Sequence, residues 1–357
     1  MYKASELELN KLLAITLERN ASDLHLIVGE PPILRIDSAL TRLEDYQVLS
    51  ADAVSDLIAI LLNPVQQKSL QDNWQLDFSY SFKDNARFRV NTYKAQGVWN
   101  IAFRLIPTQI KTLEELNLPP ILKQFTDNKQ GLVLVVGPTG HGKSTALASM
   151  INEINMTRSE HILTIEDPVE FLFTHRQSFI SQREIGQDAT TFDQALRAAL
   201  REDINVVLVG EMRDLESIAA TLTLAETGHL IFATMHTNDA AQSVDRIVDV
   251  FPGDQQGQIR AQLANTLLGV VSLRLLPKVG GGRIPACEIM VVNHAIRNVI
   301  RDNKIYEIGN IIHTSADSGM VPLDKSLASL VKQGLVELEV AQNFVLDPDY
   351  FQSLLGS

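Results

Sequence analysis

The residues with the clearest chemistry stand together near the middle of the chain. The run "GPTGHGKST" follows the apolar stretch "LVLVV" and has the spacing G-x-x-x-x-G-K-S. Backbone N–H groups of such a loop turn inward around phosphate oxygens, while the lysine adds a positive charge and the serine hydroxyl can bind Mg²⁺. A helix after the loop would point its positive end at the same anion. The pattern predicts a nucleoside triphosphate site made by Gly137, Pro138, Thr139, Gly140, His141, Gly142, Lys143, Ser144 and Thr145.

The loop alone does not choose between ATP and GTP. Because no "NKxD"-type guanine-reading run follows a later strand, the sequence favours ATP. His141 occupies a position that the loop pattern leaves open, and we expect a solvated loop residue there rather than a catalytic one.

Acidic side chains follow two of the later apolar runs. "HILTIE" leads into Glu166, Asp167 and Glu170, and "NVVLVG" leads into Glu211. The carboxyl ends of strands in an open parallel sheet line the ligand crevice, so these carboxylates can bind Mg²⁺ or orient an attacking water. A glutamate at position 211 suits hydrolysis, since it can polarise water. The alternatives are a solvated loop for the first group and a surface glutamate beside Arg213 for the second.

Two histidines stand at opposite ends of one expected strand, "GHLIFATMHT". His229 and His236 are therefore too far apart to ligate one metal ion. His236, at the carboxyl end, could sense the terminal phosphate or a neighbouring subunit. A structural role stays open for both histidines.

Short apolar runs that alternate with helical periods would position these residues. The runs are "GLVLVVG", "HILTIE", "NVVLVG" and "HLIFATM", with helical patterns between them. Continuous apolar strands joined by helices predict a parallel sheet covered on both faces. After Asp239 the pattern looks mostly helical, including the whole of "GQIRAQLANTLLGVVSLRLL", and "KVGGGR" interrupts it.

The first hundred residues predict a smaller mixed domain. Apolar residues at helical spacing indicate helices over 9–17 and 54–62, the second ended by Asn63 and Pro64. "SDLHLIVG" and "PPILRID" are typical of strands, and "LDFSYSF", "ARFRVNTY" and "WNIAFRLI" of a β-meander. We expect an α+β domain over 1–105, a linker over 106–112, and an α/β domain with a helical carboxyl-terminal region over 113–357.

Composition narrows the class of protein. The 357 residues suffice for two domains, and 43 acidic against 31 basic residues give a net charge of −12, which disfavours a nucleic-acid partner. No apolar run approaches the roughly 20 residues of a membrane span, and the amino terminus lacks a signal-peptide core. We therefore expect a cytoplasmic protein with at most peripheral membrane attachment. The single cysteine, Cys287, is expected to be a small buried residue.

Five motifs in order resemble the secretion ATPases, and within them the retraction ATPases of type IV pili. They are "GPTGHGKST", "ILTIEDPVEF", "ALREDINVVLVGEMRD", "AETGHLIFATMHT" and "AIRNVIRD", and the similarity begins at "ASDLHL" in the first domain. The resemblance implies a PAS-like amino-terminal domain followed by a RecA-like P-loop domain. It also implies a homohexameric ring in which ATP and Mg²⁺ bind between these domains and hydrolysis moves them.

The resemblance assigns roles to residues of this chain. It implies that Lys143 and Ser144 belong to Walker A and that Glu211 is the Walker B catalytic glutamate. It further implies an acidic box, a histidine box and phosphate-contacting arginines. The acidic box falls on Glu166, Asp167 and Glu170, of which Asp167 and Glu170 would face Mg²⁺. The histidine box falls on His229 and His236. The phosphate-contacting arginines are Arg87 and Arg104, and Arg89 is a weaker match.

Two positions depart from the family pattern. Gly97 in "KAQGVWN" stands where the family often carries a further arginine, and Asn205 in "REDIN" stands where it usually carries an acid. We expect the second change to affect Mg²⁺ handling modestly. The lone cysteine and short first domain argue against the extension ATPases, which carry a four-cysteine metal element. "AIRNVIRD" favours the principal over the accessory retraction ATPases.

The leading hypothesis is an ATP-driven hexameric motor that promotes pilus disassembly at the cytoplasmic face of the inner membrane. Its expected partners are the pilus platform protein and related pilus ATPases. The alternatives are an ATPase of a related secretion or DNA-uptake system, an accessory retraction ATPase, a RecA-like nucleic-acid translocase and a non-motor nucleotide-binding regulator. The net charge of −12 disfavours the translocase.

Overall fold

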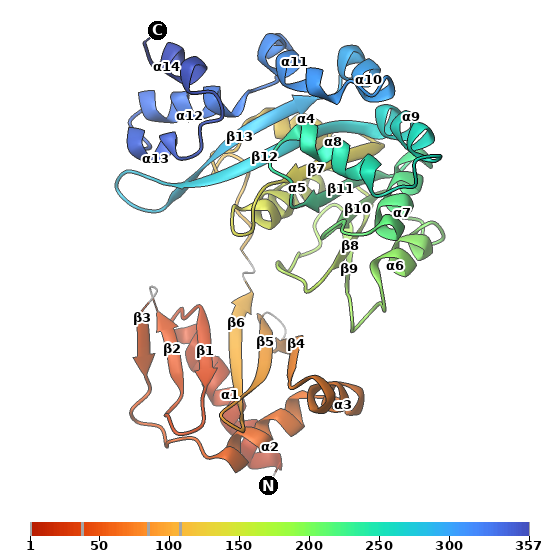
Figure 1. Cartoon of the computed structure of the whole chain (residues 1–357). Helices are drawn as coiled ribbons and strands as arrows, with labels where there is room; N and C mark the ends of the chain where they lie inside the picture. Colours follow the sequence, from red (N-terminus) through yellow and green to blue (C-terminus); the bar gives the residue numbers. More distant parts are fainter. Residues whose placement is uncertain (1, 37–38, 84–85, 107–108, 357) are drawn as a thin grey trace. The chain divides into compact units, whose positions relative to one another are not determined.

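The chain forms two compact units in the computed structural model (Figure 1). The structure describes residues 2–36, 39–83, 86–106 and 109–356, so residues 107 and 108 of the expected linker lie outside the described part. One unit comprises Met1–Gln109 with Pro168–Leu172, and the other comprises Ile110–Asp167 with Phe173–Ser357.

The first unit is a six-stranded antiparallel sheet whose apolar face packs against helices. Its strand order is β3-β2-β1-β6-β5-β4. The strands are β1 (Asp23–Leu26), β2 (Ile33–Ile36), β3 (Ala39–Arg42), β4 (Gln75–Phe82), β5 (Ala86–Ala95) and β6 (Val98–Ile106). The helices are α1 (Tyr2–Glu18), α2 (Ala51–Leu61) and α3 (Pro64–Asn73). The expected α+β architecture and meander are confirmed, whereas β3 and α3 were not expected.

The helix α3 begins where the sequence predicted only the end of α2. Asn63 accepts hydrogen bonds from the backbone N–H groups of Val65 and Gln66, at 3.0 and 2.9 Å. Proline is tolerated at the first helical position because its missing N–H would have no partner there. The Asn63–Pro64 pair therefore ends one helix and starts the next.

The turn between β5 and β6 explains the first departure from the family pattern. Gln96 and Gly97 have φ angles of +52° and +85°, and Ala95 pairs directly with Val98. A two-residue hairpin turn with both central φ angles positive favours glycine at the second position. A side chain at position 97 would carry backbone strain.

The second unit is built on a seven-stranded sheet in the order β13-β12-β7-β11-β10-β8-β9. All neighbouring strands are parallel except β12 and β13. The strands are β7 (Gly131–Val136), β8 (His161–Glu166), β9 (Phe179–Glu184), β10 (Val206–Val209), β11 (Leu230–Met235), β12 (Leu267–Pro277) and β13 (Arg283–Val291). The sequence predicted four of these strands and missed β9, β12 and β13.

Helices cover both faces of this sheet, as expected. Leu132, Leu134 and Val136 of β7 belong to one apolar cluster, and the alternate residues Val133 and Val135 belong to another. One face carries α4 (Ile121–Thr126) and α5 (Lys143–Thr157), and the other carries α6 (Phe192–Ala199), α7 (Leu215–Glu226), α8 (Ala240–Asp249), α9 (Gln256–Thr266), α10 (His294–Arg301) and α11 (Ile308–Thr314).

The prediction of one long helix over "GQIRAQLANTLLGVVSLRLL" is wrong in its second half. The helix α9 ends at Thr266, and β12 runs from Leu267 between β7 and β13. Both faces of this strand are covered, so it is apolar apart from Ser272 and Arg274 and lacks the alternation that marks half-exposed strands. "KVGGGR" is the turn of the β12–β13 hairpin, where Lys278 N–H donates to the Gly282 carbonyl at 3.1 Å.

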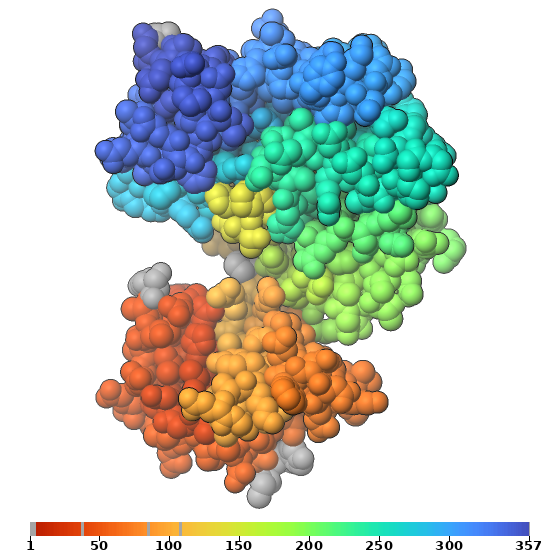
Figure 2. Space-filling view, viewed as in Figure 1, coloured from red at the N-terminus to blue at the C-terminus, as the bar shows by residue number. Residues whose placement is uncertain are grey.

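The carboxyl-terminal helices pack on the outer half of this hairpin. Leu276 and Ile284 share an apolar cluster with Leu323, Leu327 and Phe351. In Figure 2 the dark blue carboxyl-terminal helices form a block beside the paler hairpin. The helices are α12 (Leu323–Lys332), α13 (Leu338–Gln342) and α14 (Pro348–Gly356).

The single cysteine lies in this part of the unit. Cys287 is 1% exposed, as expected, and burial raises the pKa of its thiol to about 12. The reading of Cys287 as a small buried residue is therefore confirmed, since a thiol with this pKa stays protonated and unreactive near neutral pH.

Glu288 in β13 is a buried carboxyl group. Its Oε1 atom accepts a hydrogen bond from the Ala240 N–H at 2.9 Å. Burial raises the pKa of Glu288 to about 7, and the charge of Asp239 adds to this rise, while the Ala240 hydrogen bond and Arg274 oppose it. Such a group makes the stability of the fold depend on pH.

We predict that Glu288→Gln flattens the dependence of stability on pH between about 4.5 and 7. The folded state binds the Glu288 proton more tightly than the unfolded state. Protonated Glu288 therefore contributes fully to the free energy of unfolding below about pH 4.5, and this contribution is lost as the pH rises through about 7. The loss is on the order of 3 kcal/mol. Thermal unfolding of both proteins across this range measures it, with Glu339→Gln at an exposed site as control. Parallel curves for wild type and Glu288→Gln would contradict the prediction.

Candidate nucleotide site

The predicted phosphate loop lies at the carboxyl edge of the parallel sheet. It runs from the end of β7 at Val136 to the first residue of α5, Lys143. A Cβ atom on Gly137 would lie 2.6 Å from the Leu273 carbonyl oxygen of β12. Only glycine fits this contact, so β12 supports the loop from behind.

The Lys143 side chain is buried inside this edge, with 8% of the residue exposed. Its ammonium group donates to the carbonyl oxygens of Gly137 at 2.7 Å and Pro138 at 3.1 Å. The His236 Nδ1 atom lies 3.4 Å from the same nitrogen. The lysine thus connects the loop to the residue that follows β11.

His236 links the lysine to Glu211. The His236 Nε2 atom lies 3.1 Å from Glu211 Oε1, and the other carboxylate oxygen lies 2.6 Å from Arg213 Nη2. If Nδ1 accepts from the ammonium group, the ring proton of neutral His236 is on Nε2 and points at the carboxylate. Lysine, histidine, glutamate and arginine therefore form one continuous row of contacts.

The surroundings of Glu211 favour its ionised form. Burial opposes ionisation, but the hydrogen bonds from Arg213 and His236 and the charge of Arg213 outweigh it and lower the pKa of Glu211. The carboxylate is therefore charged at neutral pH, as a group that orients or accepts a proton from water must be.

Glu166 lies at the end of the neighbouring strand β8. It is 8% exposed, and its Oε1 atom accepts a hydrogen bond from Thr164 Oγ1 at 2.7 Å. Asp167, the next residue, is exposed. β10, which leads to Glu211, pairs directly with β8. Both acid-tipped strands consequently end at the same edge as the loop.

His141 is not the solvated residue that the sequence suggested. Its Nδ1 atom accepts a hydrogen bond from Leu275 N–H at 3.0 Å, and its ring contacts that of Phe344 edge-to-face. Burial, then the charges of Arg274, Lys143 and Arg283, lower the pKa of His141. The neutral ring therefore joins the loop to β12.

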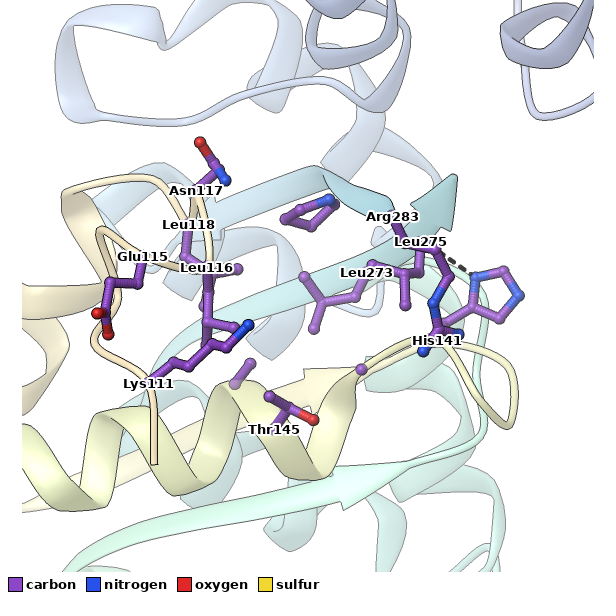
Figure 3. A pocket seen from close by; sticks show the side chains of 13 residues that line it. Lys111, Glu115, Leu116, Asn117, Leu118, His141, Thr145, Leu273, Leu275 and Arg283 are labelled. Atoms are coloured by element: carbon purple, nitrogen blue, oxygen red, sulfur yellow. Dashed lines mark hydrogen bonds between the residues drawn. The ribbon is translucent and has the colours of Figure 1, made fainter. Parts of the chain in front are cut away.

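A cavity of about 300 Å³ opens beside the loop (Figure 3). Leu116 and Leu118 line one side, Thr145 of α5 another, and Leu273 and Leu275 of β12 a third. Charged and polar groups of Lys111, Glu115, Asn117, His141 and Arg283 stand around these apolar walls.

Two residues lie at the opposite edge of the sheet. His229 precedes β11, and its Nδ1 atom donates to the Leu224 carbonyl at 3.0 Å. Seven residues of nearly extended chain put it roughly 20 Å from His236. Asn205 precedes β10, and its Oδ1 atom accepts from His161 N–H at 2.8 Å. The structure brings neither residue to the loop.

Four of the residues that sequence analysis considered belong to the first unit. Arg104 and Arg89 are directly opposite on β6 and β5, and Arg87 donates through Nε to Ser79 Oγ at 2.9 Å. Arg104 is 70% exposed, and its Nε atom donates to the buried Asp23 at 2.9 Å.

The arginines of β5 lie on the face of the sheet away from the apolar core. Phe88 and Val90 alternate with them along the strand and are buried on the other face. The fourth residue, Glu170, is exposed within Pro168–Leu172.

Sequence reasoning missed two charged residues behind the loop, Arg274 and Glu288. They are 8% and 9% exposed. Both stand inside apolar runs, and a charge at such a position is rare unless it is paired. That signal was present in "SLRLL" and "CEIMV".

The fold and site together define a P-loop ATPase of the RecA-like class. A Walker A loop follows a central parallel strand, and acid-tipped strands end beside it.

Comparisons with known proteins give the family. The family model "Type II/IV secretion system protein" matches residues 4–339. The type IV pilus retraction ATPase PilT of Pseudomonas aeruginosa is 44% identical over 345 residues, which are 97% of this chain and 100% of that protein. A twitching motility protein of Neisseria gonorrhoeae is 46% identical over 312 residues, which are 87% of this chain and 83% of that protein. A crystal structure of the pilus retraction motor PilT with bound ADP has a TM-score of 0.89 at 43% identity, covering 96% of this chain and 98% of that one.

The chain therefore belongs to the Type II/IV secretion system protein family. The expected resemblance to the pilus retraction ATPases is confirmed, as are the α/β fold and the ATPase class.

We predict that Arg213→Gln moves the acidic limb of the pH–rate profile to higher pH. Without the guanidinium group, only His236 opposes the effect of burial, so the pKa of Glu211 rises relative to wild type. The dependence of kcat/KM for ATP on pH measures this shift. Arg197→Gln removes an arginine that pairs with Asp193 on α6 and should leave the limb in place. An unmoved limb in Arg213→Gln would count against the prediction.

Proposed function

We propose that this chain is the ATP-driven motor of type IV pilus retraction. The observation that carries the proposal is the row of contacts from Lys143 through His236 to Glu211 at the phosphate loop. It gives hydrolysis a phosphate-binding cation and an ionised carboxylate in one connected site. The similarity to a pilus retraction ATPase over 97% of the chain supports retraction as the work done.

Each residue of the row has a distinct task in the proposed reaction. Lys143 and the amino end of α5 stabilise the phosphate charge. Glu211 orients the water for in-line attack and accepts its proton, and His236 holds the carboxylate in place. Arg87 and Arg104 would add positive charge at the transferred phosphoryl group, as the family resemblance implies.

The residues at the loop also fit Mg²⁺. A magnesium ion usually keeps several waters and takes one or two protein ligands plus phosphate oxygens, so a dedicated cage is not required. The Ser144 hydroxyl, at the start of α5, would bind the ion directly. As the family resemblance implies, Asp167 and Glu170 would hold its waters. When bound, Mg²⁺ neutralises charge on the phosphates.

The cavity beside the loop would hold the nucleotide base. Thr145 and Gly142 line both the loop and the cavity, so a nucleotide on the loop can extend into it. Its volume of about 300 Å³ and its leucine walls suit a planar heterocycle.

The family membership supports a proposal for the partners. We propose a homohexamer that acts on a pilus platform protein from the cytoplasmic face of the inner membrane, together with related pilus ATPases. Nucleic acid is not among the expected partners, given the net charge of −12. Among the described residues, no helix has the length and apolar character needed to cross a membrane.

We predict that Leu275→Trp raises the KM for ATP about tenfold with little change in kcat, because the indole would fill the base cavity. Steady-state ATPase assays measure both constants. Leu338→Trp, at an exposed leucine of α13, is the matched control. A normal KM in Leu275→Trp would place the base elsewhere.

The proposed function is tested by deleting the gene and restoring it as wild type or as Glu211→Gln. The purified Glu211→Gln protein should bind ATP but hydrolyse it at least about 100-fold more slowly. Cells that lack the gene or carry this variant should be hyperpiliated and unable to twitch, and wild type should restore movement. Loss of pili on deletion would instead indicate an extension motor, and unchanged pili and twitching would overturn a role in this system.

A further inference from the structure

The position of His236 depends on a short segment of irregular backbone. His236 follows β11, and α8 begins four residues later at Ala240. The His236 side chain is 43% exposed, so packing of the ring does not fix it. Its 3.1 Å contact with Glu211 therefore depends on the backbone of residues 237–239 as well as on the Lys143 contact at the other ring nitrogen.

Two neighbouring strands hold this segment from behind. The Asn238 carbonyl oxygen accepts hydrogen bonds from Ser272 Oγ at 2.7 Å and from Arg274 Nη2 at 2.9 Å, both from β12. The Ala240 N–H donates to Glu288 of β13 at 2.9 Å. Three hydrogen bonds thus tie the segment and the first residue of α8 to the β12–β13 hairpin, and Gln242 and Ser243 of α8 hold the segment from the other end.

Arg274 also contacts the backbone that supports the phosphate loop. Its Nη1 atom donates to the Leu273 carbonyl oxygen at 3.0 Å. That oxygen is the atom against which Gly137 packs so closely that no side chain fits. One guanidinium group therefore joins the carbonyl behind the loop to the carbonyl two residues after His236.

Arg274 is suited to this bridging role by burial and charge. The residue is 8% exposed, and burial lowers the pKa of its guanidinium group, while the nearby carboxyl groups of Glu288 and Asp239 oppose this shift. The planar guanidinium presents donors in fixed directions, which a lysine ammonium group does not. A buried cation without such partners would be costly, so the contacts hold the group in one place.

We propose that Arg274 is a positioning residue for ATP hydrolysis. It fixes the spacing between the phosphate loop and the segment after β11, and thereby keeps His236 between Lys143 and Glu211. Arg274 touches neither Lys143 nor Glu211 through the hydrogen bonds described, so it acts through His236. The inference rests on the proposed function, in which Glu211 acts on the attacking water.

The test compares Arg274→Lys with wild type in steady-state ATP hydrolysis. The lysine keeps the buried positive charge but cannot bridge both carbonyl oxygens. We expect kcat to fall about tenfold or more, as for other residues that orient a catalytic group, while the KM for ATP changes less than about threefold. Lys278→Gln, at an exposed basic residue of the same hairpin, should leave both constants unchanged.

A double-mutant cycle with His236→Ala separates positioning from general damage. If Arg274 acts through His236, Arg274→Lys should lower kcat in wild type but not in the His236→Ala protein. An equal loss in both backgrounds would show damage that does not pass through His236, and would overturn the proposal. A normal kcat in Arg274→Lys would overturn it as well.

Folding and the proposed function are checked in the same experiment. Should Arg274→Lys unfold, Arg274→Gln/Glu288→Gln removes the buried charge and its counter-charge together and carries the same prediction. A double variant that folds with normal kcat overturns the inference. ATP hydrolysis that survives Glu211→Gln would refute the proposed function, whereas normal Arg274 variants beside an inactive Glu211→Gln refute only the role of Arg274.

Discussion

The buried ammonium group of Lys143 is the centre on which the second unit's site depends. A cation at 8% exposure needs acceptors, and the loop carbonyls of Gly137 and Pro138 supply them. The contact with His236 then extends this arrangement to β11, and His236 extends it to Glu211 after β10. One charge therefore brings the ends of three parallel strands into a single connected site.

The sheet makes this arrangement possible because its parallel strands end at the same edge. β11 stands between β7 and β10, so the residues after all three strands are neighbours. β12 is also parallel to β7 but continues past it, and Leu273 and Leu275 contact Gly137 and His141 of the loop. The outer half of the hairpin packs against α12 and α14. Contiguous contacts thus run from the phosphate loop to the carboxyl-terminal helices.

The first unit presents a different electrostatic arrangement. Arg104 and Arg89 are directly opposite on neighbouring strands, and Asp23 stands opposite both Arg104 and Arg35. Like charges that face each other across strands are destabilising, and Asp23 offsets part of this repulsion. Asp77 pairs with Arg89 in the same way, and the role of these arginines at the phosphates stays a prediction.

Local pattern in the sequence sufficed to predict the phosphate loop, the acid-tipped strands and the meander, because glycine spacing and short apolar runs each impose their own backbone geometry. It failed for β12, since a strand covered on both faces has no alternation and its apolar residues also satisfy a helical period. The contact of Glu211 with His236, the contacts of His141 with Leu275 and Phe344, and the hydrogen bond from Arg274 to Asn238 were decided only by the tertiary structure. These contacts join residues that are far apart along the chain, and only the assembled sheet brings them together.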